Sequence, residues 1–185
     1  MWNVADARGI ARDLVGSIEP RWSHVQAVGR RAEDLVAAQG LDERLAVAAW
    51  LHDIGYGAAI NDRGFHPVDG AVYLQGQGAP DEIVALVAWH TGAAWEADER
   101  GLRSDLEVLP APSPPDLDAL TLIDLATSPT GEPIVDVDRL AEILTRYEES
   151  DPVHRAVTRS QGPLLESSRR AKVRLGLPED WPVCG

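Results

Sequence analysis

The sequence is short of cysteine and of long apolar runs. Its single cysteine, Cys184, excludes an intrachain disulfide and fits a reducing compartment, so we expect a cytoplasmic protein. No apolar run reaches the roughly 18 residues that a membrane-spanning helix needs. Residues 1–16 contain acids and no long apolar stretch, unlike a signal peptide. We therefore expect no membrane partner.

Basic residues are also scarce. The 185 residues include 30 Asp or Glu but only 17 Lys or Arg, which gives a formal net charge of −13. Such a chain repels a phosphate backbone, so we expect no nucleic acid duplex as a partner. A small phosphorylated substrate would need local help from a metal ion or from a few well-placed arginines.

Alternation of apolar and polar residues with the period of a β-strand is hard to find, and there are no internal repeats. The apolar residues recur instead with a helical period, and 44% of the chain is hydrophobic, which is enough for a core. The length suits one domain. We predict a single all-α domain over residues 1–185, a bundle of about seven to nine helices.

Caps and turns set the expected helix boundaries. Asp42 is a candidate N-cap, Gly40 a candidate C-cap, and Pro67 suits the first turn of a helix. Residues 104–116 contain four prolines and predict an ordered loop or a linker. The predicted helices cover residues 4–17, 21–40, 41–53, 67 onward, 80–90, 117–127, 136–149, 151 onward and 163–175, and an irregular tail covers residues 177–185.

Several polar residues lie on the apolar faces of these helices or at their ends. They are His24, His52, His66, His90 and Asp124. A single inward histidine is usually bonded to a carbonyl, and a single inward aspartate is usually a cap or half of an ion pair. Taken together, each would need a separate partner, whereas one shared cation would satisfy all of them.

The stretch AAWLHDIGYG adds to this pattern. Neighbouring side chains on a helix point about 100° apart, so His52 and Asp53 can reach one ion only where the helix ends. Gly55 and Gly57 follow and permit a turn there. The alternative is a solvated helix end. We expect the fifth histidine, His154, to be an ordinary surface residue.

The combination of His24, His52-Asp53 and Asp124 resembles the HD-domain superfamily of metal-dependent phosphohydrolases. Its pattern is a first histidine, an adjacent His-Asp pair and a distant aspartate, each on its own helix of an all-α bundle. The resemblance covers roughly residues 20–128 and includes RWSHVQAVGRRAEDL, AAWLHDIGYG, FHPVDGAVYL and VAWHTGA. It implies a metal-dependent phosphohydrolase of a nucleotide or another small phosphate ester.

Two further histidines resemble those of the dinuclear branch of this superfamily. FHPVDGA supplies His66 and AWHTGA supplies His90. The resemblance implies one ion held by His24, His52, Asp53 and Asp124, and a second held by Asp53, His66 and His90. Asp53 and His52 would then be essential for catalysis, because the ions activate the water that attacks phosphorus. Imidazole and carboxylate ligands suit one or two divalent ions of Fe, Mn, Co, Ni or Zn.

Arg21, Arg63 and Tyr56 are candidates for contacts with the substrate. Both arginines are close in sequence to the expected ligands and could bind phosphate, although ordinary surface arginines would give the same pattern. Tyr56 is the aromatic residue that we expect to face the cavity. Two other readings stay open: a catalytically weak scaffold that binds a nucleotide or a partner protein, and an all-α interaction module. Exposed tryptophan-rich ends could also support a homodimer.

Overall fold

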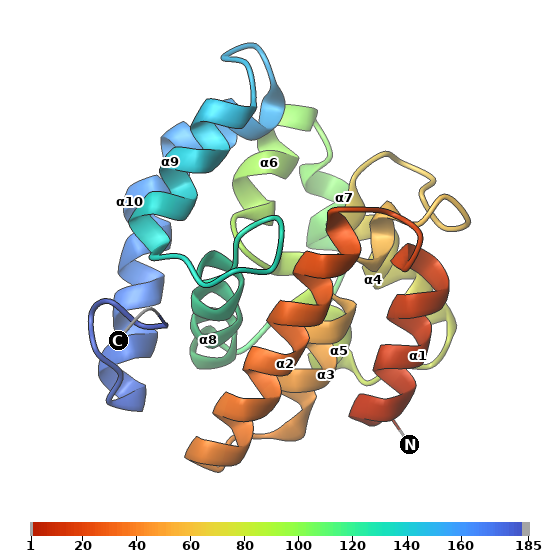
Figure 1. Ribbon diagram of the computed structural model, residues 1–185. Helices are drawn as coiled ribbons and strands as arrows, with labels where there is room; N and C mark the ends of the chain where they lie inside the picture. Colours follow the sequence, from red (N-terminus) through yellow and green to blue (C-terminus); the bar gives the residue numbers. More distant parts are fainter. Residues whose placement is uncertain (1, 183–185) are drawn as a thin grey trace.

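The computed structural model describes residues 2–182, which form helices joined by loops (Figure 1). The elements are α1 (Val4–Val15), α2 (Arg21–Gln39), α3 (Glu43–Leu51), η1 (Ile54–Tyr56), α4 (His66–Gly76), α5 (Asp81–Trp89), α6 (Ala93–Arg100), α7 (Arg103–Glu107), α8 (Pro114–Leu125), α9 (Asp136–Arg146) and α10 (Pro152–Leu175). Over residues 2–182 the β-structure is limited to one isolated bridge between Thr127 and Pro133. The prediction of an all-α bundle is confirmed.

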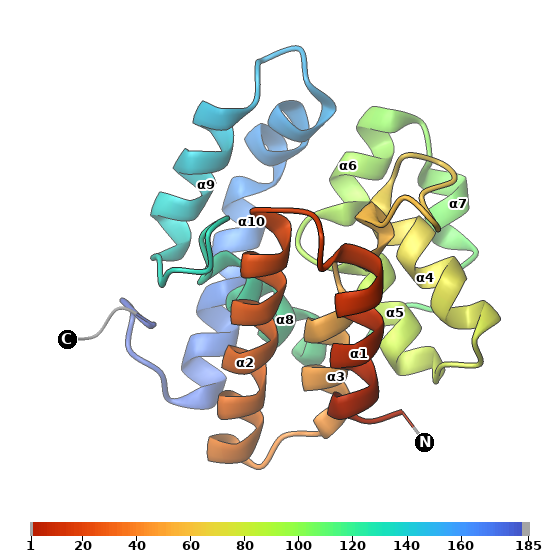
Figure 2. The same ribbon diagram turned by 45° about the vertical axis from the view of Figure 1, so that its right-hand side comes forward.

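The helices pack in two groups that α8 connects. In the first group α3 packs against α1, α2 and α5, and α5 packs against α4. In the second group α10 packs against α6 and α9. Helix α8 contacts α10 as well as α2, α3 and α5. Figure 2 shows α9 and α10 towards the left of the molecule and α1, α3, α4 and α5 towards the right, with α2 in front between them.

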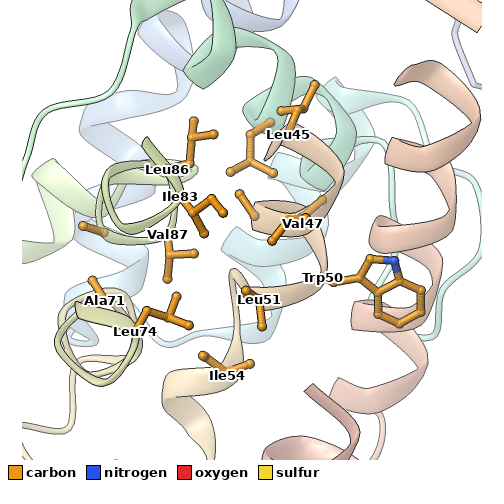
Figure 3. Close-up of a cluster of buried hydrophobic side chains, with 14 of the residues drawn as sticks. Leu45, Val47, Trp50, Leu51, Ile54, Ala71, Leu74, Ile83, Leu86 and Val87 are labelled. Carbon is orange, nitrogen blue, oxygen red and sulfur yellow. The ribbon is translucent and has the colours of Figure 1, made fainter. Parts of the chain in front are cut away.

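The core is centred on α3, α4 and α5. Figure 3 shows Leu51 and Ile54 facing Leu74 on α4 and Ile83 and Val87 on α5. All five of these side chains are fully buried. The same cluster of buried hydrophobic residues extends from α1 to α10. Burial of this kind supplies the main favourable free energy of folding and fixes the relative positions of the helix ends.

The predicted caps of the second and third helices are present. Gly40 ends α2 with φ +63°, and its N–H donates to the carbonyl of Val36. The side chain of Asp42 accepts a hydrogen bond from the backbone N–H of Arg44 at the start of α3. Pro67 lies in the first turn of α4, where its missing N–H costs nothing.

Two predicted boundaries are wrong. The stretch 104–116 is only partly a loop, because α7 covers residues up to Glu107 and α8 begins at Pro114. The two helices predicted after residue 150 are one 24-residue helix, α10, which continues through Pro163. Pro163 is exposed, so water can satisfy the carbonyl that the missing N–H leaves free, and packing on α6, α8 and α9 holds both halves.

The tryptophans are not exposed, contrary to the reason given for a homodimer. All six are buried or half-buried, and Trp2 and Trp181 pack against the core. Among residues 2–182, the exposed large apolar side chains are instead four valines: Val72, Val108, Val137 and Val173. The homodimer stays a prediction without this support.

The segment after α10 is irregular but packs on the core through Leu177 and Trp181. Residues Leu177 to Pro182 have no helical structure, as predicted, and Cys184 lies outside the described residues. No helix among residues 2–182 combines the length and the hydrophobicity that crossing a bilayer requires.

Candidate metal centre

Four histidines and two aspartates from five helices converge at one place in the fold. They are His24 on α2, His52 and Asp53 after the last turn of α3, His66 at the start of α4, His90 at the end of α5 and Asp124 on α8. All are buried except His66, whose side chain is 12% exposed. The structure thus brings together all six side chains that the sequence predicted as ligands.

A first group, group A, consists of His24, His52 and Asp53. Their ligand atoms lie within 4.8 Å of one another. The Oδ2 atom of Asp53 is 3.4 Å from His52 Nε2 and 4.0 Å from His24 Nε2. Asp124 borders the same space, with its Oδ1 atom 3.1 Å from His24 Nε2 and 4.0 Å from His52 Nε2. Group A and Asp124 therefore offer two imidazoles and two carboxylates to one ion.

A second group, group B, consists of Asp53, His66 and His90. The Oδ1 atom of Asp53 is 3.2 Å from His66 Nε2 and 3.8 Å from His90 Nε2. The two Nε2 atoms are 3.2 Å apart. Asp53 belongs to both groups, and it turns one oxygen toward each.

Backbone carbonyls orient three of the four imidazoles. The Nδ1–H groups of His24, His52 and His90 donate to the carbonyls of Ser128, Ala49 and Val87, at 3.0, 2.8 and 2.7 Å. A neutral imidazole has one N–H, so the Nε2 atom of each ring keeps its lone pair and faces the centre. Histidines that bind metals in proteins are commonly held in this way.

Two of these Nε2 atoms lack the partner that a lone pair needs. His52 Nε2 is buried and has no hydrogen-bond partner among the described residues. His24 Nε2 faces the carboxylate of Asp124, although the single N–H of a neutral ring is already used at Ser128. A proton or a cation between these atoms resolves both contacts, and the borderline-soft donor set fits a divalent transition metal.

The protonation states follow from the same contacts. Burial alone would lower the pKa of His52, but the carboxylates of Asp53 and Asp124 outweigh it and raise this pKa to about 9. Burial, with His66 and His52 nearby, lowers the pKa of His90 to about 3. Burial alone would raise the pKa of Asp53, but Arg21 and His52 hold it well below its usual range. His52 therefore holds a proton that a metal ion can replace.

The end of α3 lets His52 and Asp53 face the same space, as the sequence suggested. The helix ends at Leu51, and Asp53 has φ −105° and ψ +7°, outside the helical region. Glycine is needed at position 55 for a different reason from the predicted turn, because the φ of Gly55 is not positive. A Cβ at Gly55 would lie 2.0 Å from the carbonyl oxygen of His66. Glycine at this position permits the close approach of η1 to α4.

Gly55→Ala is accordingly expected to push His66 away from Asp53. The added methyl group meets backbone atoms, which cannot rotate aside, so we expect a loss of roughly 1–3 kcal/mol of unfolding free energy. Metal binding should weaken as well. Thermal unfolding with and without metal measures both effects. The control is Gly76→Ala at the end of α4, where an added Cβ would have no atom within 4 Å. This substitution should be neutral or stabilising. Equal behaviour of the two variants would contradict the packing role of Gly55.

The structure brings two of the three predicted substrate contacts to the centre. Arg21 donates to Asp53 Oδ2 at 2.6 Å and lies 4.0 Å over the ring of Tyr56, which stacks on His66 at 4.1 Å. Arg63 does not reach it, because its side chain bonds Asp105 and Asp69. His154 also lies elsewhere, half-buried on α10 beside Thr158.

A cavity opens beside the centre, and part of its wall was not predicted from the sequence. Arg21, His24, Asp53, Tyr56, His66, His90 and Asp124 line one side. Helices α9 and α10 supply Arg139, Arg146 and Ser160, and Tyr147 follows the end of α9. The sequence does contain a pattern that indicates this wall. Arg139, Ile143 and Arg146 recur at helical spacing, as do Ala156, Ser160 and Leu164. Each set places polar side chains on an inward face.

Comparison with known proteins identifies the family. The family model of the HD domain matches residues 21–126, which is more than half of the chain and includes all six candidate ligands. No curated protein and no solved structure matches the chain. HD domains form a superfamily of metal-dependent phosphohydrolases that bind divalent metals, and this agrees with the groups of histidine and aspartate found here. The chain belongs to the HD-domain family.

Proposed function

We propose that this chain is a metal-dependent phosphohydrolase that acts on a nucleotide or another small phosphate ester. We further propose that the centre holds two divalent ions that share Asp53. The observation that carries the proposal is the orientation of that carboxylate. Its Oδ2 atom faces His24 and His52, and its Oδ1 atom faces His66 and His90.

The bound ions would polarise the phosphoryl oxygens of the substrate and activate water for attack on phosphorus. The chain's own residues prepare the site for this chemistry. The carbonyls of Ser128, Ala49 and Val87 hold three imidazoles with Nε2 facing the centre, so little reorientation of the rings is needed on binding. The ions would also supply the local positive charge that an acidic chain with a net charge of −13 otherwise lacks.

Arg21 has a separate role in this proposal. Its guanidinium bonds Asp53, the residue shared by the two groups, and lies over the ring of Tyr56. A planar guanidinium can donate two parallel hydrogen bonds to a phosphate, so Arg21 is suited to orient the phosphoryl group. The ring of Tyr56 fixes the guanidinium and closes one side of the cavity.

Metal affinity should rise with pH. Since the pKa of His52 is raised to about 9, an ion that binds near neutral pH must first displace the His52 proton. The pKa of His90 is lowered to about 3, so that ring is already neutral and adds no dependence. We expect the dissociation constant to fall by up to about tenfold per pH unit between about pH 6 and about pH 8, for one displaced proton. Competition with a coloured chelator measures this. An affinity that stays constant over the range would contradict the account of His52.

Turnover tests the proposed activity. The protein, loaded in turn with Mn, Fe, Co, Ni and Zn, is offered nucleoside mono-, di- and triphosphates, dinucleoside polyphosphates and cyclic dinucleotides. We expect hydrolysis of at least one class, dependent on metal and absent in His52→Ala. Binding of a nucleotide without turnover under any metal would support the scaffold alternative instead. The full set of six donors favours an enzyme, because a scaffold has no need to keep them.

A further inference from the structure

The cavity beside the metal centre has a second polar wall, made by α9 and α10. Figure 2 shows these two helices side by side, and both follow the segment matched to the HD domain. A neighbouring cavity shares Arg21, His24, Tyr56, Arg139 and Arg146 with the first. The two hollows therefore meet at the arginines, between the metal centre and α9.

Buried polar atoms without partners are concentrated on this cavity. Among the described residues, five buried side-chain nitrogen or oxygen atoms have no hydrogen-bond partner. Three of them, Thr91 Oγ1, Arg139 Nε and Ser160 Oγ, belong to residues that line it. Such atoms are costly in a folded protein unless a ligand satisfies them, so their concentration here indicates a binding site.

Arg139 is the strongest of these signals. It is only 6% exposed, and its Nη1 group donates to Glu142, while Nε has no partner. A buried guanidinium is rarely left with an unused donor, because desolvation of a charged group is expensive. Burial lowers the pKa of Arg139, and the nearby carboxylate of Asp124 partly offsets this by favouring the charged guanidinium. The arginine thus lies within electrostatic reach of the metal ligands.

Arg146 and Ser160 complete this wall. Arg146 lies two helical turns after Arg139 on the same face of α9, shares Glu142 with it, and has a side chain that is 36% exposed. Ser160 on α10 is 1% exposed, and its hydroxyl can donate or accept. With one carboxylate, Glu142, between two guanidinium groups, the wall keeps a net positive charge. That charge is opposite in sign to the chain as a whole and suits an anion.

We propose that Arg139, Arg146 and Ser160 form a second oxyanion subsite, which selects phosphate esters that carry another anionic group besides the phosphate to be cleaved. This inference rests on the proposed function for the identity of the cleaved group. It adds a substrate class: compounds with two oxyanions, a second phosphate or a carboxylate, that span the cavity from the metal ions to α9. The apolar side chains of Ile143, Val153 and Val157 line the same cavity and can contact the organic part between the anions.

Equilibrium binding of phosphonates tests the subsite without turnover, because carbon–phosphorus bonds are not hydrolysed. The probes are methylphosphonate, which has one anionic group, and alkane bisphosphonates of increasing chain length. An ω-phosphono carboxylic acid of matched length separates a second phosphate from a carboxylate. We expect the best probe with two anions to bind the metal-loaded protein about tenfold or more tightly than methylphosphonate, as hydrogen bonds to charged groups contribute this much.

Arg139→Gln and Arg146→Gln should each remove most of this preference and leave the affinity for methylphosphonate and the metal content unchanged. Ser160→Ala should weaken the same preference and leave the melting temperature unchanged or higher, since the buried hydroxyl has no partner to lose. Arg159→Gln is the matched control, because Arg159 pairs with Glu99 on α6 and is 54% exposed. It should keep the full preference.

The outcomes separate the subsite from the proposed activity. If the wild-type protein binds two-anion probes no more tightly than methylphosphonate, or if Arg139→Gln and Arg146→Gln both keep the preference, the subsite is refuted, whatever the turnover. If the preference depends on Arg139 and Arg146 but no phosphate ester is hydrolysed, the subsite stands and the proposed activity fails. Should Arg139→Gln not fold, Arg146→Gln and Ser160→Ala still decide the question.

Discussion

Asp53→Asn is expected to remove metal binding and hydrolysis together. The substitution keeps the shape of the side chain but takes away the charge and one oxygen from a carboxylate that faces both groups A and B. Changes in residues behind metal ligands already cost about 10–100-fold, so loss of a ligand shared by two ions should exceed about a hundredfold in activity. Metal content and turnover of the purified variant measure both losses.

A control for Asp53→Asn must also remove a buried carboxylate. Asp118 suits this purpose because it is 6% exposed and is bonded by Ser167 and Arg170, away from the metal groups. Asp118→Asn is expected to lower stability and to keep its metal. If Asp53→Asn folds, binds metal as the wild type does and retains its activity, Asp53 is not a shared ligand and the proposed centre is wrong.

His90→Ala is expected to reduce the bound metal from two ions per chain to one. His90 contributes an imidazole to group B only, with Nε2 at 3.8 Å from Asp53 Oδ1. Group A and Asp124 keep all four of their donors in this variant, so the first ion should stay. Activity should fall by at least about a hundredfold if both ions take part in the reaction. Elemental analysis after equilibration with metal gives the stoichiometry.

His154→Ala is the matched control for His90→Ala. It removes the one histidine that belongs to neither group, so both ions and the activity should remain. A wild-type protein that binds a single ion at saturation would overturn the two-metal proposal, and the one-metal form of the mechanism would then apply. Retention of two ions in His90→Ala would show that His90 is not a ligand.

The ligands could be predicted because each interrupts a regular pattern. His24, His52, His90 and Asp124 occupy positions where the helical period calls for an apolar residue, and helices place such residues at the core. The helix end after Leu51 was predictable because two adjacent polar side chains cannot face one point from a regular helix. Local rules were sufficient for these elements.

The second wall of the cavity could not be predicted in the same way. Arg139 and Ser160 meet the metal centre only because α9 and α10 pack back onto α8 and α6, and no local pattern gives that contact. The turn that orients His24 is similar. Gly131 has φ +89°, and its Cα lies so close to α2 that a Cβ would be 2.8 Å from the carbonyl of Ser23. This approach brings the carbonyl of Ser128 to the imidazole.

The same limit explains the misplaced helix boundary near Pro163. A proline inside a helical pattern usually marks an end, because it removes one hydrogen bond and crowds the preceding turn. Here the residues on either side, Ser160 and Leu164, are buried against neighbouring helices, and the proline itself faces solvent. Tertiary packing therefore outweighs the local preference.

The most direct test of the central claim is an anomalous difference map of crystals of the protein loaded with a single transition metal, recorded at the absorption edge of that metal. We predict two peaks flanking the carboxylate of Asp53, one bonded by His24, His52 and Asp124 and the other by His66 and His90. A protein saturated with metal in solution that shows no peak beside Asp53, with these six side chains arranged as described here, would contradict the account.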